Sequence, residues 1–211
     1  MLIYQYVGKI EEMMLMHRKS DKSLLSLLIG NKLVRNVKIN EILPCISDKE
    51  RIRVVCQVDR ELTDVLPVLY LYIPNATYNE RTGALTFMYK QHMITIFKSG
   101  KITGTYMRDR KEAEQIMMEV KDLINRAIVY VMTHGPPSKD LIASKKPVSA
   151  LTVQKHLPGT NCGKCGEKTC YAFAVKVSTG EKDIDECPEL KLPENLEKYH
   201  ELRKLLRPIV I

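Results

Sequence analysis

The chain has 211 residues, of which 45% are hydrophobic and 27% charged, and its formal net charge is +8. These values are typical of globular proteins, and they exclude a wholly disordered chain and a fibrous repeat. The excess of basic residues permits a polyanionic partner, although a charge of this size is also ordinary for solubility.

Residues 1–50 form a segment of unclear role, which we expect to pack on the next domain. Gly8–Lys19 and Lys22–Gly30 have the composition of helices, and Val37–Ile46 fits either a strand or a loop. Met1–Val7 is too short for a signal peptide, and no apolar run approaches the roughly 20 residues that span a bilayer. The sequence therefore predicts a cytoplasmic protein with no membrane contact.

Residues 51–133 predict an α+β domain. Arg51–Val58 alternates in the manner of a strand, and the residues after it have the spacing of a helix face, with Leu66, Leu69, Tyr70 and Ile73 on that face. Three antiparallel strands are expected next, over Ala84–Tyr89, Met93–Phe97 and Lys101–Met107.

A long helix closes this domain. Asp109 and Glu112 form a capping pair at its start. Apolar residues then recur at helical spacing, at Ala113, Ile116, Met117, Val120, Leu123, Ile124, Ala127 and Val131. The order of elements predicts an antiparallel sheet with its helices on one face.

Three stretches of this domain resemble one half of the TATA-binding protein fold. They are Ile73-Pro74-Asn75-Ala76-Thr77-Tyr78-Asn79, the run from Ile94 to Thr105, and the helix Arg110–Arg126. The resemblance implies a curved antiparallel sheet backed by a long helix. The DNA-binding saddle of that family needs two halves and paired wedging rings, whereas residues 1–50 do not repeat the pattern and only Phe97 stands where a ring is expected. We therefore favour a protein or ligand over nucleic acid at this sheet, although a homodimer would supply the second half.

Proline and glycine mark a linker over residues 134–147, followed by a second domain over 148–192. Residues 193–211 are expected to form a C-terminal helix and tail. Pro193–Arg207 is the helical part, with Leu196, Tyr199, Leu202 and Leu206 on one face.

The strongest signal is the spacing of four of the six cysteines. Cys162, Cys165, Cys170 and Cys187 lie within 26 residues. Gly163 and Gly166 follow two of them, where the backbone must turn and leave amide groups facing the sulfurs. This spacing fits a [4Fe–4S] cluster better than a zinc ion, because zinc sites more often show two close pairs. Zinc and unligated thiols remain open on spacing alone, and Cys45 and Cys56 are expected to be small buried residues.

The residues around these cysteines resemble a known four-cysteine module. The stretch from Leu157 to Ala174, then Gly180-Glu181 and Cys187-Pro188-Glu189-Leu190, is similar to the iron–sulfur domain of the large (gamma) subunit of the corrinoid iron–sulfur protein, in the acetyl-CoA decarbonylase/synthase system. A related domain occurs in the B subunit of Rnf-type electron-transport complexes. The resemblance implies a [4Fe–4S] cluster whose ligands are Cys162, Cys165, Cys170 and Cys187, in an anaerobe, namely a methanogenic archaeon.

No motif of an independent active site is present, so the chain is expected not to be an enzyme. The resemblance implies an electron carrier or redox accessory to a partner metalloenzyme of anaerobic one-carbon or corrinoid metabolism. One alternative is a redox-responsive regulator that binds nucleic acid through the domain similar to the TATA-binding protein. Another is an assembly protein with a structural zinc site.

Overall fold

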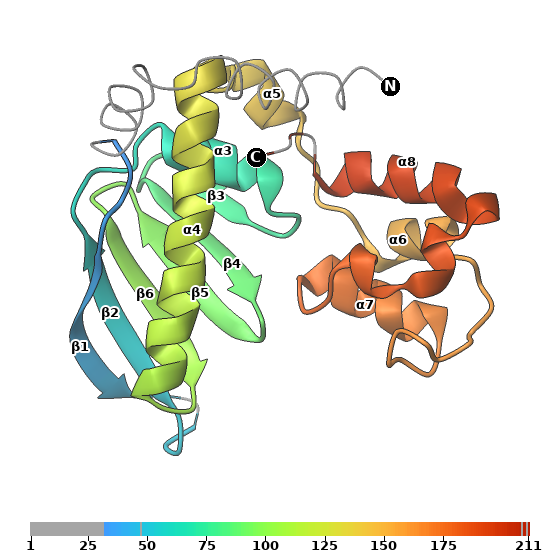
Figure 1. Cartoon of the computed structure of the whole chain (residues 1–211), viewed down its shortest axis with the longest axis horizontal. Helices are drawn as coiled ribbons and strands as arrows, with labels where there is room; N and C mark the ends of the chain where they lie inside the picture. Colours follow the sequence, from blue (N-terminus) through green and yellow to red (C-terminus); the bar gives the residue numbers. More distant parts are fainter. Residues whose placement is uncertain (1–31, 47, 208, 210) are drawn as a thin grey trace, which may run out of the picture. The chain divides into compact units, whose positions relative to one another are not determined.

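A six-stranded antiparallel sheet dominates the first part of the described chain (Figure 1). In spatial order its strands are β1 (Val37–Pro44), β2 (Ile52–Val58), β6 (Lys101–Met107), β5 (His92–Phe97), β4 (Ala84–Tyr89) and β3 (Thr77–Asn79). The four strands predicted from the sequence are confirmed, and Val37–Ile46 proves to be mainly strand. The three-residue strand β3 was not expected.

The computed structural model describes residues 32–46, 48–207, 209 and 211. The helices expected over 8–19 and 22–30 lie outside this part of the chain. Contacts divide the chain into two units, Met1–Leu33 and Val34–Ile211, and the sheet and all the helices described here belong to the second.

Two helices accompany the sheet, α3 (Val65–Tyr72) and α4 (Arg110–His134), and α4 lies across one sheet face (Figure 1). The predicted cap of α4 is confirmed, because the Asp109 carboxylate accepts a hydrogen bond from the Glu112 amide at 2.8 Å. The Glu112 carboxylate itself accepts from the Arg108 amide, at 2.6 Å. The predicted apolar stripe is buried except at its end, where Ile128 is buried and Val131 only half-buried.

The C-terminal part is helical. It comprises α5 (Lys139–Ser144), α6 (Ala150–His156), α7 (Cys170–Thr179), α8 (Leu196–Leu206) and the short 3₁₀ helices η1 (Ile184–Glu186), η2 (Pro188–Lys191) and η3 (Pro193–Asn195). It has a core of its own, formed by Val153, Leu157, Phe173, Ala174, Val177, Ile184, Cys187, Leu190, Tyr199, Leu202 and Leu206. Leu196 was expected on the buried face of α8 but is 39% exposed, because the α-helix begins only at this residue.

Side-chain contacts tie the sheet part to the helical part. The Asn75 amide donates to the carbonyl of Val177, in the last turn of α7, at 3.0 Å. The ammonium of Lys145 donates to the carbonyls of Tyr70 and Ile73 at the end of α3, to Ile73 at 2.5 Å. It lies 4.5 Å from the centroid of the Tyr70 ring. Among the described residues, no helix is both long and apolar enough to cross a membrane.

Lys145→Met tests the contact with α3. The substitution keeps the length of the side chain but removes charged hydrogen bonds to two carbonyls, so we expect the free energy of unfolding to fall by about 1–3 kcal/mol at pH 7. Lys146→Met, at the exposed neighbouring lysine, should leave it unchanged. Urea unfolding of the anaerobically purified protein measures both.

The same pair of variants carries a pH signature. Burial lowers the pKa of Lys145 from 10.5 to about 8, so between these values the unfolded chain binds more protons and stability rises with pH. The difference in unfolding midpoint between the natural protein and Lys145→Met should therefore be constant below pH 7 and widen from pH 8 to 10.5. A constant difference over the whole range would contradict this assignment.

Candidate metal centre

The four clustered cysteines come together around one small cavity. Cys162 and Cys165 lie in the loop between α6 and α7, Cys170 is the first residue of α7, and Cys187 joins η1 to η2. Exposure falls across the set: Cys162 is exposed, Cys165 and Cys170 are half-buried, and Cys187 is 5% exposed. All four residues predicted as ligands therefore face a common space.

The loop is shaped by residues with a left-handed backbone. Asn161, Gly163 and Gly166 have φ values of 48°, 73° and 82°. The Gly166 amide donates to the Gly163 carbonyl at 2.9 Å, which closes a tight turn around Cys165. The expected turns at both glycines are thus present, and an L residue with a side chain would be strained at either position.

Asn161 is a positioning residue that our sequence reasoning missed. Its side-chain oxygen accepts a hydrogen bond from the Cys170 amide at 2.8 Å. One side chain therefore fixes the residue before Cys162 to the first residue of α7. An asparagine beside a cysteine in a glycine-rich loop was an available signal, since asparagine adopts the left-handed region more readily than most residues.

Backbone amides stabilise negative charge on two of the sulfurs. The Lys164 amide and the Thr160 hydroxyl donate to Cys162, and these bonds hold the pKa of the Cys162 thiol below its usual value. Burial raises the pKa of Cys187, and the nearby thiols of Cys165, Cys170 and Cys162 raise it further, while the Leu190 amide opposes the shift by donating to the sulfur. The site therefore crowds four groups that become negative on deprotonation, and it supplies some of the N–H donors that such groups need.

Two lysines brace the loop. Lys164, between Cys162 and Cys165, forms an ion pair with Glu189 of η2 at 2.6 Å. This pair joins the loop of the first two cysteines to the segment just after Cys187. Lys182 donates to the Cys165 carbonyl at 2.8 Å and pairs with Glu186 at 3.1 Å. The role of Lys182 could not be predicted from local sequence, because its partner lies 17 residues away.

The remaining candidates lie apart from this cavity. Cys45 and Cys56 are buried, as expected, and burial raises the pKa of Cys56 to about 11, so its thiol stays protonated at neutral pH. Within the described ranges, no group of three or more His, Cys, Asp or Glu side chains is placed to hold a single metal ion.

Comparison with known proteins assigns the cysteine segment. Residues 157–189 match a family model described as "Putative Fe-S cluster". The chain is 42% identical over 65 residues to the acetyl-CoA decarbonylase/synthase complex subunit gamma of Methanocaldococcus jannaschii, and 44% identical over 63 residues to that of Methanothermobacter thermautotrophicus. It is also 45% identical over 42 residues to the corrinoid/iron–sulfur protein large subunit of Moorella thermoacetica.

These matches are local. They cover 31%, 30% and 20% of this chain and only 13%, 13% and 9% of the three relatives. The chain therefore contains an iron–sulfur cluster-binding segment related to these subunits, and it spans a small part of their length. The resemblance expected from the residues around the cysteines is confirmed for this segment of the chain.

Asn161 offers a test of how the loop is positioned. Asn161→Ala removes the hydrogen bond to the Cys170 amide and strains the left-handed backbone, so iron should be lost to a chelator several-fold faster than from the natural protein. Asn161→Asp keeps an acceptor oxygen and should lose iron at close to the natural rate. The measurement is the decay of visible absorbance under argon after a ferrous chelator is added. Equal rates for the natural protein and Asn161→Ala would contradict the role given to this side chain.

Proposed function

We propose that the chain binds one [4Fe–4S] cluster through Cys162, Cys165, Cys170 and Cys187 and serves as an electron carrier, or redox accessory, for a partner metalloenzyme. The observation that carries this proposal is the gathering of all four thiols around one cavity, inside a segment related to known iron–sulfur proteins. No catalytic role is proposed for the chain itself.

The donor set fits this group. Four thiolates are the usual ligands of a [4Fe–4S] cluster, and each binds a separate iron, so the sulfurs surround a volume and do not converge on one point. All four cysteines line one cavity, as a common set of cluster ligands would. The amides that donate to Cys162 and Cys187 supply N–H···S bonds of the kind that tune cluster potential.

The two sides of the cysteine cavity differ in their exposure to solvent. When bound, such a cluster takes up and releases single electrons. Cys165 and Cys170 pack against the hydrophobic core of the helical part, where Phe173 is only 1% exposed, so water is excluded on that side. Cys162 is exposed on the other side, which leaves a short path for electrons to a docked protein.

The partner is proposed from relatedness. The names of the relatives refer to a corrinoid/iron–sulfur protein and to acetyl-CoA decarbonylase/synthase. Because the matches cover so little of those subunits, any corrinoid chemistry would have to reside on another chain. We therefore place the partner among the metalloenzymes of anaerobic one-carbon metabolism.

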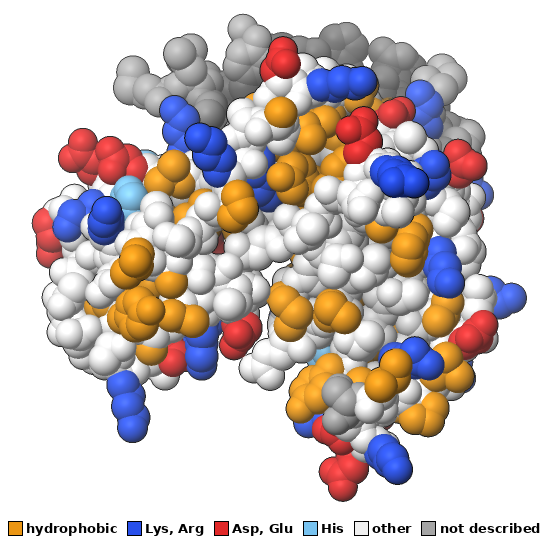
Figure 2. Space-filling view, turned by 180° about the vertical axis from the view of Figure 1, so that it is seen from behind, with side chains coloured by type: hydrophobic (Ala, Val, Ile, Leu, Met, Phe, Trp, Pro, Cys, Tyr) orange, Lys and Arg blue, Asp and Glu red, His pale blue; other side chains and the backbone are white. Residues whose placement is uncertain are grey.

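The sheet is proposed as a docking element with the architecture of half a TATA-binding protein. On the face turned away from α4, paired positions place Thr86, Thr95 and Thr103 in one row, with Val55 beside them. The centre of that face carries few charged side chains (Figure 2). Phosphate contacts need cations, so this surface supports a protein partner, or a second copy of the chain, over a DNA duplex.

Loss of a ligand cysteine should abolish cluster binding. The anaerobically purified protein should contain roughly four iron and four sulfide per chain and give an EPR signal on reduction with dithionite, since a [4Fe–4S] cluster has this composition. Cys187→Ala should hold less than a quarter of that iron, because it removes a buried ligand. Cys45→Ala, at a cysteine outside the cavity, should retain it. One zinc and no iron per chain would overturn the proposal in favour of a structural zinc site.

The nucleic-acid alternative makes a separate prediction. If the sheet bound a duplex, affinity would fall steeply with salt as counterions are released. We expect the protein to cause no salt-dependent change in the fluorescence anisotropy of a pool of labelled DNA duplexes between 50 and 200 mM salt. A steep dependence would instead support the nucleic-acid-binding alternative.

A further inference from the structure

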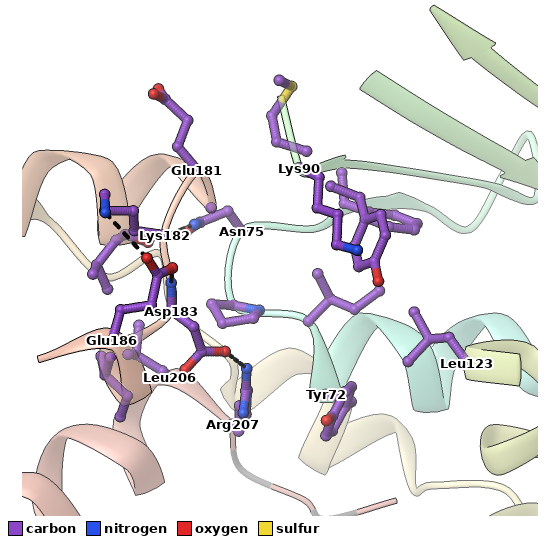
Figure 3. A pocket seen from close by; sticks show the side chains of 18 of the residues that line it. Tyr72, Asn75, Lys90, Leu123, Glu181, Lys182, Asp183, Glu186, Leu206 and Arg207 are labelled. Atoms are coloured by element: carbon purple, nitrogen blue, oxygen red, sulfur yellow. Dashed lines mark hydrogen bonds and ion pairs between the residues drawn. The ribbon is translucent and has the colours of Figure 1, made fainter. Parts of the chain in front are cut away.

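A cavity of about 360 Å³ lies where the sheet meets the end of α7 and the end of α8 (Figure 3). Its walls come from the end of α3 and the loop after it, the end of β4, the middle of α4, and the segments after α7 and α8. Ligand pockets in proteins begin at about 300 Å³, so this cavity has room for one small molecule. None of the four clustered cysteines lines it.

The inner wall is apolar and aromatic. Phe87, Leu123 and Leu206 line the cavity and are each at most 5% exposed. Tyr72 extends from the last residue of α3 and presents its ring at the lower edge of Figure 3. A flat ring of a ligand would find both a hydrophobic wall and an aromatic neighbour here.

Two guanidinium groups gather at the Tyr72 ring. The Cζ atom of Arg126, from α4, lies 5.9 Å from the ring centroid, and that of Arg207, just after α8, lies 5.1 Å from it. Two cations beside one ring repel each other; the Asp183 carboxylate beside Arg207 offsets part of this repulsion, and an anion near Arg126 would offset more. The two arginines come from residues 81 positions apart, so only the folded chain assembles the pair.

The two arginines differ in how they are neutralised. Arg207 forms an ion pair with Asp183, drawn as a dashed line in Figure 3. In the part of the chain that the structure describes, no carboxylate lies within ion-pair distance of Arg126, which lines the cavity and is exposed. The positive charge of Arg126 is thus available to a ligand. Lys90 enters from the other side of the cavity and is paired with Glu119 at 2.7 Å.

We propose that this cavity binds a small organic phosphate that carries a flat ring, of about the size of a mononucleotide. Guanidinium groups present paired N–H donors that match phosphate oxygens. The apolar wall and the Tyr72 ring would hold the rest of the molecule. This inference does not depend on the proposed cluster, because the lining residues and the cysteines are separate sets.

Equilibrium dialysis of the full chain against AMP, under argon, tests the proposal. AMP should bind saturably, whereas adenosine lacks the phosphate and inorganic phosphate lacks the ring, so each should bind at least tenfold more weakly. Arg126→Gln should weaken AMP binding about tenfold, the value expected when one hydrogen bond to a charged group is lost. Arg110→Gln removes an exposed arginine of the same helix that does not line the cavity, and it should leave binding unchanged.

Several results would overturn the proposal. Absence of saturable AMP binding up to 10 mM, a concentration at which even a very weak site would fill, excludes the ligand class. Equal binding of inorganic phosphate and AMP excludes a role for the aromatic wall. Unchanged AMP binding to Arg126→Gln places the ligand elsewhere. Since Arg126 is exposed, this variant is expected to fold, and an unchanged iron content separates loss of the ligand site from loss of the cluster.

Discussion

The arrangement of the four cysteines depends on a backbone that turns in the left-handed region three times in six residues. Gly163 and Gly166 take this conformation without a side chain to clash, and Asn161 takes it while its amide oxygen binds the Cys170 backbone. If this loop were extended, Cys162 and Cys165 would point away from the start of α7. Charge sets the second requirement, since four thiolates repel one another and need N–H donors and a metal group to offset that repulsion.

The helical part supplies what the loop lacks. Cys187 is buried against Phe173 and its neighbours in a core that does not include the sheet. Burial alone makes a thiolate unfavourable, as the raised pKa of Cys187 shows. A positive partner such as an iron centre would favour the deprotonated form of Cys187, as does the Leu190 amide that donates to its sulfur. The exposed Cys162, whose pKa is lowered by N–H and O–H donors, has the opposite balance.

Sequence reasoning succeeded where the signal was local and periodic. The stripe along α4 and the alternation in β2, β4, β5 and β6 correspond to elements with one buried face. Strand β3 was missed because three residues are too few to show alternation, and β1 was ambiguous because most of its residues are exposed at the sheet edge. At the site, cysteine spacing identified the set around the cavity. Asn161 and Lys182 were missed because their contacts form only in the folded chain. The approach of Arg126 and Arg207 to the Tyr72 ring has no local sequence signal either.

Lys182 links the cavity beside the sheet to the cysteine loop. Its side chain lines the cavity between the sheet and the helical part, and its ammonium donates to the Cys165 carbonyl at 2.8 Å. Asn75, from the loop after α3, also lines that cavity and binds the last turn of α7, whose first residue is Cys170. An anion near Lys182 would compete for its ammonium with the Cys165 carbonyl and with the Glu186 carboxylate, which already share it. The turn that carries Cys165 is therefore linked to the neighbouring cavity through Lys182, and Cys187 follows directly after Glu186, which lines that cavity.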